Sequence, residues 1–245
     1  MTKAEIQLVK SLGDKKSRTE TGLFLAEGEK LISELRGSSL SVRKIYCLEG
    51  VFEGAGVEWV AGREMERISQ LKSANNSVAL VDIPKYKLEV GELKDQLVLM
   101  LDNVQNPGNL GTIIRLADWF GVENIICSPA CADCFNPKVV QATMGAIVRV
   151  KVHYAPLEPI LQELQAAQVP IYGTLLDGDN IYKESLSASG VIVMGNEGQG
   201  ISAEVQRFIS RKLYIPPFPA DCPGSESLNV SIATAVVCSE FRRRM

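Results

Sequence analysis

The sequence predicts an α/β protein, in which a parallel sheet with helices on both faces forms the larger part. From Leu97 onward, short apolar segments alternate with amphipathic ones, which is the order of strands and helices in such a sheet. The run 97–101 is apolar throughout, as expected for a strand buried on both faces. With 46% hydrophobic residues, the chain of 245 residues can also supply a sizeable core.

A smaller α/β unit is predicted for the first 83 residues. Its expected helices are 29–35 and 64–71, and its expected strands are 21–26, 42–48, 57–60 and 78–81. Residues 84–96 are polar and charged without a dominant period, which is typical of a linker. The expected organisation is therefore one domain over 1–83, a linker over 84–96 and a second domain over 97–245.

The second domain is expected to continue the alternation to the end of the chain. Strands beyond 97–101 are expected at 124–127, 149–152, 171–175, 191–194 and 212–215. The expected helices are 112–120, 137–146, 157–168, 203–208 and 229–242. Parallel strands all end at one edge of their sheet, and ligands bind outside that edge. Three polar loops follow strands of this set, so we expect one site built from all three.

The first of these loops runs from Asn106 to Arg115. Gly111 permits close approach of the backbone to a ligand. Arg115 follows Asn109 by about one and two-thirds helical turns, so it stays near the strand ends. A guanidinium there can hold a phosphate through two parallel hydrogen bonds. The alternative is an arginine on the helix surface that pairs with Asp118.

The second and third loops follow the strands 191–194 and 212–215. Gly195–Gly200 carries Glu197 among three glycines, and its alternative interpretation is a plain glycine turn. The third loop is rich in proline and closes where an apolar helix begins. Ser225, Ser227 and Asn229 there have the side chains that cap a helix N-terminus. The chain lacks the phosphate-loop and dinucleotide-binding glycine motifs.

Charge and hydropathy limit the possible partners. The net charge of −3 argues against broad, nonspecific binding of nucleic acid. Basic residues still gather locally, at Lys10, Lys15, Lys16 and Arg18 and again at 242–244, although they could simply be solvated surface charges. No apolar run reaches the roughly 18 residues of a membrane span, and the first residues lack an apolar signal segment. A cytoplasmic protein without membrane contact is the expectation.

Three of the six cysteines are closely spaced. Cys127, Cys131 and Cys134 form C-x3-C-x2-C, the spacing with which radical enzymes hold a four-iron cluster. No other cluster of metal ligands accompanies them, and free cysteine is a common small buried residue. We therefore expect structural cysteines and no metal site, and we keep a radical enzyme as the alternative.

The three loops together resemble the motifs of the SpoU, or TrmH, branch of the SPOUT methyltransferases, and they occur in family order. Asn109, Gly111 and Arg115 match the first motif, and Gly195, Glu197 and Gly200 match the second. Ile215-Pro216 and Ser227 to Ser231 match the third. Residues 10–30 are similar to the substrate-binding domain of the family. The chain departs from the family at 217–226, where the loop is a few residues longer.

The resemblance implies a methyltransferase domain with a deep trefoil knot, S-adenosylmethionine as the cofactor, and a homodimer with residues of both subunits at each site. It implies methylation of a ribose 2'-hydroxyl in RNA, with rRNA as the expected substrate and tRNA as the alternative. A non-catalytic RNA-binding protein of the same fold is a further alternative. The catalytic residues would be Arg115, Asn109, Glu197, Ser227 and Asn229, and the cofactor would lie near Gly195, Ile215, Leu228 and Leu175. The exposed RNA-binding residues of the N-terminal domain would be Lys15, Lys16 and Arg18.

Overall fold

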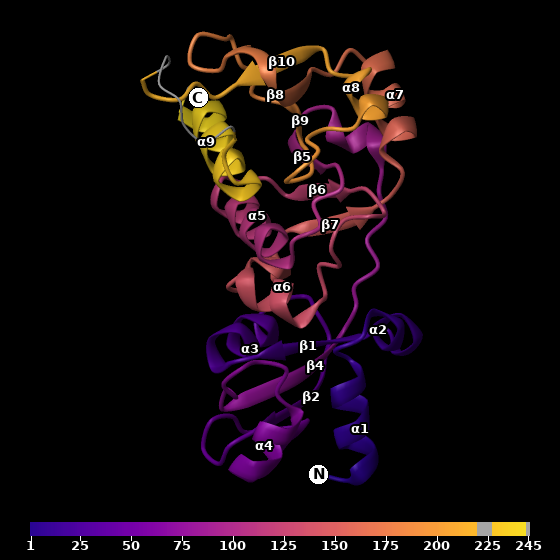
Figure 1. Ribbon diagram of the computed structural model, residues 1–245. Helices are drawn as coiled ribbons and strands as arrows, with labels where there is room; N and C mark the ends of the chain where they lie inside the picture. Colours follow the sequence, from indigo (N-terminus) through magenta and orange to yellow (C-terminus); the bar gives the residue numbers. More distant parts are fainter. Residues whose placement is uncertain (220–226, 244–245) are drawn as a thin grey trace. The chain divides into compact units, whose positions relative to one another are not determined.

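The computed structural model describes residues 1–219 and 227–243 (Figure 1). The chain forms two compact units. The first comprises Met1–Lys85 and Asp133–Val148, and the second comprises Tyr86–Ala132 and Arg149–Met245. The chain therefore passes between the units three times, and a short segment from the middle of the sequence folds with the N-terminal unit.

The first unit is built on a four-stranded mixed sheet. The strand order is β1 (Leu23–Glu27), β4 (Ser77–Asp82), β2 (Val42–Cys47) and β3 (Val57–Trp59). All neighbours are antiparallel except β2 and β3, which are parallel. Its helices are α1 (Lys3–Ser11), α2 (Lys15–Thr21), α3 (Glu29–Arg36), α4 (Gly62–Ile68) and α6 (Pro137–Ala142), followed by a 3-10 turn at Ala146–Val148. The four predicted strands are present, whereas α1 and α2 were not predicted.

Apolar side chains explain why these elements pack together. Thr2 and Glu5 cap the start of α1, and the buried Ile6 and Val9 of this helix join the core formed with β1, β2 and β4. The segment 133–148 contributes α6, which packs against β1. The rings of Phe24 and Phe135 lie 4.8 Å apart, centroid to centroid. The segment 133–148 is therefore part of the packing of this unit.

The second unit contains a six-stranded sheet in which all neighbouring strands are parallel. This confirms the predicted α/β class. The strand order is β10-β8-β9-β5-β6-β7. The strands are β5 (Leu97–Leu101), β6 (Asn124–Cys127), β7 (Lys151–Tyr154), β8 (Ile171–Asn180), β9 (Gly190–Met194) and β10 (Arg211–Tyr214).

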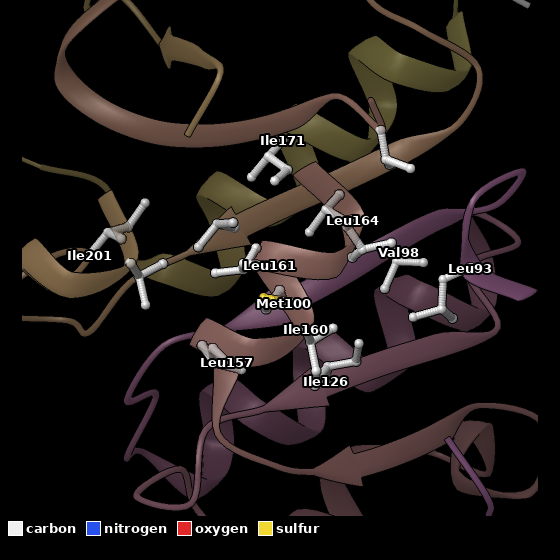
Figure 2. Packing of buried hydrophobic residues seen from close by; sticks show 14 residues of the cluster. Leu93, Val98, Met100, Ile126, Leu157, Ile160, Leu161, Leu164, Ile171 and Ile201 are labelled. Atoms are coloured by element: carbon white, nitrogen blue, oxygen red, sulfur yellow. The ribbon is translucent and has the colours of Figure 1, made fainter. Parts of the chain in front are cut away.

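Helices lie on both sides of this sheet (Figure 1). On one side are α5 (Pro107–Trp119) and α9 (Val230–Arg243), and on the other are α7 (Leu157–Ala166) and α8 (Ala203–Gln206). Figure 2 shows the apolar core that α7 shares with the sheet. Leu93, from a 3-10 turn at Val90–Leu93, is 3% exposed in this core, so the segment expected to be a linker is partly packed there.

Several boundaries differ from the sequence prediction. Helix α5 begins at Pro107, five residues before the predicted start at 112, because Asn106 caps it and proline suits the first turn. Helix α6 ends at Ala142 rather than at 146, and β7 is shifted by two residues toward the C-terminus. The difference at α5 affects the site directly, since the first polar loop is largely the first turn of a helix.

None of the helices in the part of the chain that the structure describes is long and apolar enough to cross a membrane.

Candidate functional site

The three predicted loops meet at one edge of the sheet of the second unit. The strands β5, β9 and β10 are parallel members of one sheet, so their carboxyl ends share that edge. The loop after β5 leads into α5, and the loop after β9 carries Glu197. Asn229, from the third predicted loop, directly precedes α9. This geometry brings residues about 90 and 120 positions apart in the sequence into hydrogen-bond contact.

Asn106 and Asn103 fix the backbone of the first loop. The side-chain oxygen of Asn106 accepts hydrogen bonds from the backbone N–H groups of Gly108 at 2.8 Å and Asn109 at 3.2 Å. Asn103 has a φ of 58°, in the left-handed region that asparagine tolerates. Ser128 binds both its backbone N–H and its side-chain oxygen, each at 3.0 Å. The sequence reasoning missed Asn103 and Ser128, because their pairing joins two different strand ends.

Glu197 connects the second loop to the first. One carboxylate oxygen accepts from the side-chain amide of Asn109 at 2.9 Å and from the N–H of Asn106 at 3.2 Å. The other accepts from the N–H of Gln105 at 3.4 Å. Partial burial alone would raise the pKa of Glu197, but the bonds from Asn109 and the backbone together lower it below its ordinary value. Glu197 is therefore a fixed anion at neutral pH, and a plain glycine turn does not describe this loop.

Asn229 completes the connection from the third segment. Its amide nitrogen donates to the side-chain oxygen of Asn109 at 3.0 Å. Its own side-chain oxygen accepts from the N–H and the hydroxyl of Ser231, so Asn229 caps the start of α9 as predicted. The side-chain amide of Asn109 thus donates through its nitrogen and accepts through its oxygen. One chain of hydrogen bonds joins Glu197, Asn109 and Asn229 across three segments, and we call these three residues the amide cluster.

Arg115 belongs to the same helix, α5, as Asn109 of this cluster. It is exposed, and no hydrogen bond or ion pair joins its guanidinium to the described residues. Asp118, the alternative partner considered from the sequence, is held instead by Arg149 through two bonds of 2.8 Å. The guanidinium of Arg115 is therefore available to an anionic ligand.

The remaining predicted catalytic residue, Ser227, is exposed two residues before Asn229. Its hydroxyl makes no hydrogen bond to the amide cluster in the described part of the chain. Most of the longer loop expected at 217–226 lies outside the described residues, as does Ser225.

The predicted cofactor residues come from three neighbouring strands and from the start of α9. Leu175 lies in β8, Gly195 follows β9 and Ile215 follows β10, while Leu228 is 51% exposed before α9. A Cβ atom on Gly195 would collide with the backbone of Gly200 and Ile201, so only glycine fits there. Apolar side chains next to close backbone turns fit a cofactor with a flat base and an aliphatic chain that carries a sulfonium group.

The predicted RNA-binding residues differ in exposure. Lys15 and Lys16 are exposed on α2. Arg18 is not, and the expectation that it lies exposed is wrong, because only 2% of it is accessible. Its guanidinium donates to Asp133 at 2.6 and 3.1 Å and to the carbonyl oxygens of Leu12 and Gly13. Arg18 therefore holds the first unit together.

The closely spaced cysteines are buried thiols. Cys127 and Cys131 belong to the second unit and Cys134 to the first. A hydrogen bond from Cys127 lowers the pKa of Cys131 to about 7 despite its burial, and Cys131 also contacts the carbonyl oxygen of Leu101 at 3.3 Å. No group of three His, Cys, Asp or Glu side chains suited to a metal occurs among the described residues. The radical-enzyme alternative finds no support in this arrangement.

A parallel sheet with a polar, hydrogen-bonded site outside its carboxyl edge defines an α/β protein of the ligand-binding or enzymatic class. Residues 96–239 match the model of the SpoU rRNA methylase family, and residues 3–83 match that of the MRM3-like substrate-binding domain. The chain belongs to the SpoU rRNA methylase family.

Individual proteins show the same likeness over nearly the whole chain. The 23S rRNA (guanosine(2553)-2'-O)-methyltransferase RlmP of Bacillus subtilis is 31% identical, covering 95% of this chain and 94% of that protein. The structure of a putative RNA methyltransferase of the TrmH family from Porphyromonas gingivalis superposes with a TM-score of 0.90 at 35% identity, covering 100% of this chain and 99% of that one. An AdoMet-bound rRNA methyltransferase from Sinorhizobium meliloti has a TM-score of 0.87 at 28% identity, covering 100% and 96%.

Proposed function

We propose that this protein transfers a methyl group from S-adenosylmethionine to a ribose 2'-hydroxyl of rRNA. The observation that carries the proposal is the amide cluster at the carboxyl edge of the sheet, which is joined through Asn109 to the helix that also carries the exposed Arg115. Membership of the SpoU family and the likeness to RlmP over nearly the full chain support the type of reaction and the class of RNA.

Some residues of the site would bind the cofactor, and others would bind and orient the RNA. S-adenosylmethionine, when bound, supplies an electrophilic methyl group, and Leu175, Gly195, Ile215 and Leu228 would hold it. Arg115 would bind the phosphate next to the target ribose and stabilise the alkoxide that forms as the hydroxyl attacks. A guanidinium is a poor base because it stays protonated in proteins, so Arg115 acts by charge and position.

Glu197 helps to hold Arg115 in position, and it acts through its hydrogen bond with Asn109. Its lowered pKa keeps it ionised, so it cannot donate a proton at neutral pH, and its hydrogen bonds fix the first turn of α5. Asn229 fixes Asn109 from the opposite side. Both are therefore positioning residues for the helix that carries Arg115, and Ser227 is proposed to contact the ribose.

The N-terminal part is proposed to be the RNA substrate-binding domain, with 1–83 as its main segment, 84–96 as its connection and 97–245 as the methyltransferase domain. The match of residues 3–83 to a substrate-binding domain supports this role. Exposed Lys15 and Lys16 supply local positive charge on a chain whose net charge is −3. Since its proposed substrate is rRNA, the enzyme is expected in the cytoplasm.

The proposal includes a homodimer and a trefoil knot. Leu228 and Ile232 leave apolar surface exposed at the start of α9, at 51% and 53%, which suits contact with a second copy. Light scattering of the purified protein tests the dimer, and an experimental structure traced through 220–226 tests the knot.

Methylation of bulk RNA tests the reaction itself. The purified protein is incubated with S-adenosylmethionine labelled on its methyl group and with rRNA or tRNA from cells lacking the gene. A 2'-O-methyl group blocks alkaline cleavage of the next phosphodiester, so the label is expected in alkali-resistant dinucleotides of rRNA. Label in mononucleotides would indicate a methylated base and contradict the proposal. Cofactor binding without any transfer would favour the non-catalytic RNA-binding alternative.

A further inference from the structure

A second set of hydrogen bonds joins the ends of three neighbouring strands of the second unit. Strands β9, β5 and β6 are adjacent in the sheet, with β5 in the middle (Figure 1). Asn196, Asn103 and Ser128 follow the last residues of these strands within two positions. We call these three residues the strand-end network. None of them belongs to the amide cluster, but Asn196 directly precedes Glu197 in the second loop.

Ser128 forms two hydrogen bonds with Asn103. Its hydroxyl oxygen accepts from the backbone N–H of Asn103 and its hydroxyl donates to the side-chain oxygen of Asn103, both at 3.0 Å. Ser128 is 7% exposed, so water does not readily replace these bonds. The pair holds Asn103 at a φ of 58°, which few residues other than glycine and asparagine adopt. Ser128 therefore fixes the direction of the carbonyl group of Asn103.

The carbonyl group of Asn103 binds the second loop. Its oxygen accepts from the side-chain amide nitrogen of Asn196 at 2.8 Å. The side-chain oxygen of Asn196 accepts from the backbone N–H groups of Gly198 at 2.9 Å and Gln199 at 3.0 Å. The backbone groups of Asn196 and Gly200 also bind each other in both directions. Asn196 therefore shapes the second loop and attaches it to the end of β5.

Two successive residues of the second loop thus bind the first loop. Asn196 binds the carbonyl oxygen of Asn103, and Glu197 binds the side chain of Asn109. The bond between Glu197 and Asn109 is exposed, so water competes with it. Each residue has only two soft backbone dihedral angles, so a fixed Asn196 leaves Glu197 little freedom of position. The contact of Glu197 with Asn109 therefore depends on the bond that Asn196 makes.

We propose that Ser128, Asn103 and Asn196 are positioning residues for the methyl transfer, because they hold the second loop where Glu197 can bind Asn109. The inference rests on the proposed function, and it extends the residues that place the first turn of α5 as far as the end of β6. These residues act through Glu197 and do not themselves touch the reacting atoms.

The alternative is that the strand-end network stabilises the sheet without affecting the reaction. Ser210 offers a matched comparison, because its hydroxyl oxygen accepts from the N–H of Ile171 at 3.0 Å and its hydroxyl donates to the carbonyl oxygen of Ile171 at 3.1 Å. These bonds lie where β8 begins, at the opposite edge of the sheet. Ser128→Ala and Ser210→Ala thus each remove two hydrogen bonds, but only Ser128 lies at the edge that carries the site.

Hydrogen exchange measured by mass spectrometry tests the link without cofactor or RNA. In the full-length protein, Ser128→Ala is expected to speed exchange about fivefold in peptides that cover 196–200, because the N–H groups of this loop lose the fixed position of their acceptor. Ser210→Ala should leave exchange at 196–200 as in the wild type. Asn103→Gly is a second test, since glycine adopts a φ of 58° without strain but cannot bind the hydroxyl of Ser128. It should show the same increase.

Steady-state methylation of rRNA tests the effect on the reaction. Ser128→Ala is expected to lower kcat about fivefold, as for the loss of one net hydrogen bond in the transition state. In the Glu197→Gln background the same substitution should lower kcat no further, because Ser128 acts through Glu197. Ser210→Ala should leave kcat unchanged in both backgrounds. Where Ser128→Ala does not fold, Asn103→Gly takes its place in both experiments.

Two results would overturn the inference. One is exchange at 196–200 that neither Ser128→Ala nor Asn103→Gly changes. The other is an equal fall in kcat in the wild-type and Glu197→Gln backgrounds, which would mean that Ser128 affects turnover independently of Glu197. Failure of the proposed function looks different, since the wild-type protein would transfer no methyl group while exchange at 196–200 would still respond to Ser128→Ala.

Discussion

Asn109 is the residue on which the proposed site most depends, because its amide donates to Glu197 and accepts from Asn229. An aspartate has the same shape but no N–H to donate. Asn109→Asp would place a second carboxylate 2.9 Å from that of Glu197. We expect it to lower kcat at least tenfold, and more than Asn109→Ala, because like charges repel.

A second substitution separates charge from shape in this variant. Glu197→Gln removes one carboxylate and, in the double variant, provides an amide that can donate to the carboxylate introduced at position 109. Partial recovery of kcat over the single Asn109→Asp variant is expected in a steady-state assay. Equal kcat of the double variant and the single Asn109→Asp variant would show that Glu197 does not act through Asn109.

Substitution of Arg115 separates the contribution of this residue to cofactor binding from its contribution to methyl transfer. Arg115→Ala is expected to abolish methyl transfer while the Kd for S-adenosylmethionine stays within a few-fold, because Arg115 lies in α5 whereas the proposed cofactor residues lie in β8, after β9 and β10, and before α9. Calorimetry with the cofactor and a turnover assay measure the two effects. Tenfold weaker cofactor binding with turnover preserved would reverse the assignment.

Glu197 also predicts a dependence on pH. Because its folded pKa is lowered, its hydrogen bonds contribute stability that is complete above the ordinary glutamate pKa of about 4.3 and is lost as pH falls through the lower folded value. The difference in Tm between wild type and Glu197→Gln should be constant from neutral pH to about pH 5. It should shrink in more acidic solution. A difference that grows on acidification would contradict the direction of the shift.

The sequence predicted that loops after different strands lie close together where a motif and a strand end coincided. Asn109, Glu197 and Asn229 were proposed as site residues in this way, and the structure joins them by hydrogen bonds. Arg18 was predicted as exposed because α2 was not recognised, and its partner Asp133 is distant in the sequence. Asn103 and Ser128 were missed for the same physical reason, since neither shows a local pattern that reveals the other.

At the scale of elements, α6 depends on a polar contact as well as on its apolar face. Arg18 of α2 is buried against Asp133, four residues before α6 begins. Asp133→Ala would leave the guanidinium of Arg18 in the interior without its counter-charge. We expect a loss of about 2 to 4 kcal/mol in the free energy of unfolding. Denaturant titration measures it, and Asp133→Asn, which keeps an acceptor, should cost less.

Element types were easier to predict than element boundaries. The strand β5 was predicted with its observed limits, because an uninterrupted apolar run marks a strand buried on both faces. The start of α5 was not, because Pro107 and Gly108 suggest a turn unless the capping bonds of Asn106 are known. The position of α6 in the first unit could not be predicted, because it follows from packing against β1.

At the scale of the whole molecule, the first unit includes residues from within the region that matches the SpoU family. Deletion of 1–83 would remove β1 and leave Phe135, Val139 and Val140 without the residues that bury them. We expect the remaining fragment to bind S-adenosylmethionine but to be cleaved by trypsin at Lys138 faster than the intact chain is, because this exposed lysine lies in α6, which packs against β1. Mass spectrometry of the digest identifies the site. Equal protection of Lys138 in both proteins would show that 133–148 folds independently.

The threefold passage of the chain between its units also bears on how such proteins exchange parts during evolution. The first unit is encoded in two separate stretches, 1–85 and 133–148. A recombination event with one crossover near residue 85 would replace residues 1–85 and keep the original residues 133–148. The residues at positions 18 and 24 would then pack against a segment from a different parent. Functional hybrids with relatives should therefore inherit both stretches from the same parent, and a change at position 18 should be accompanied by a compensating change at position 133.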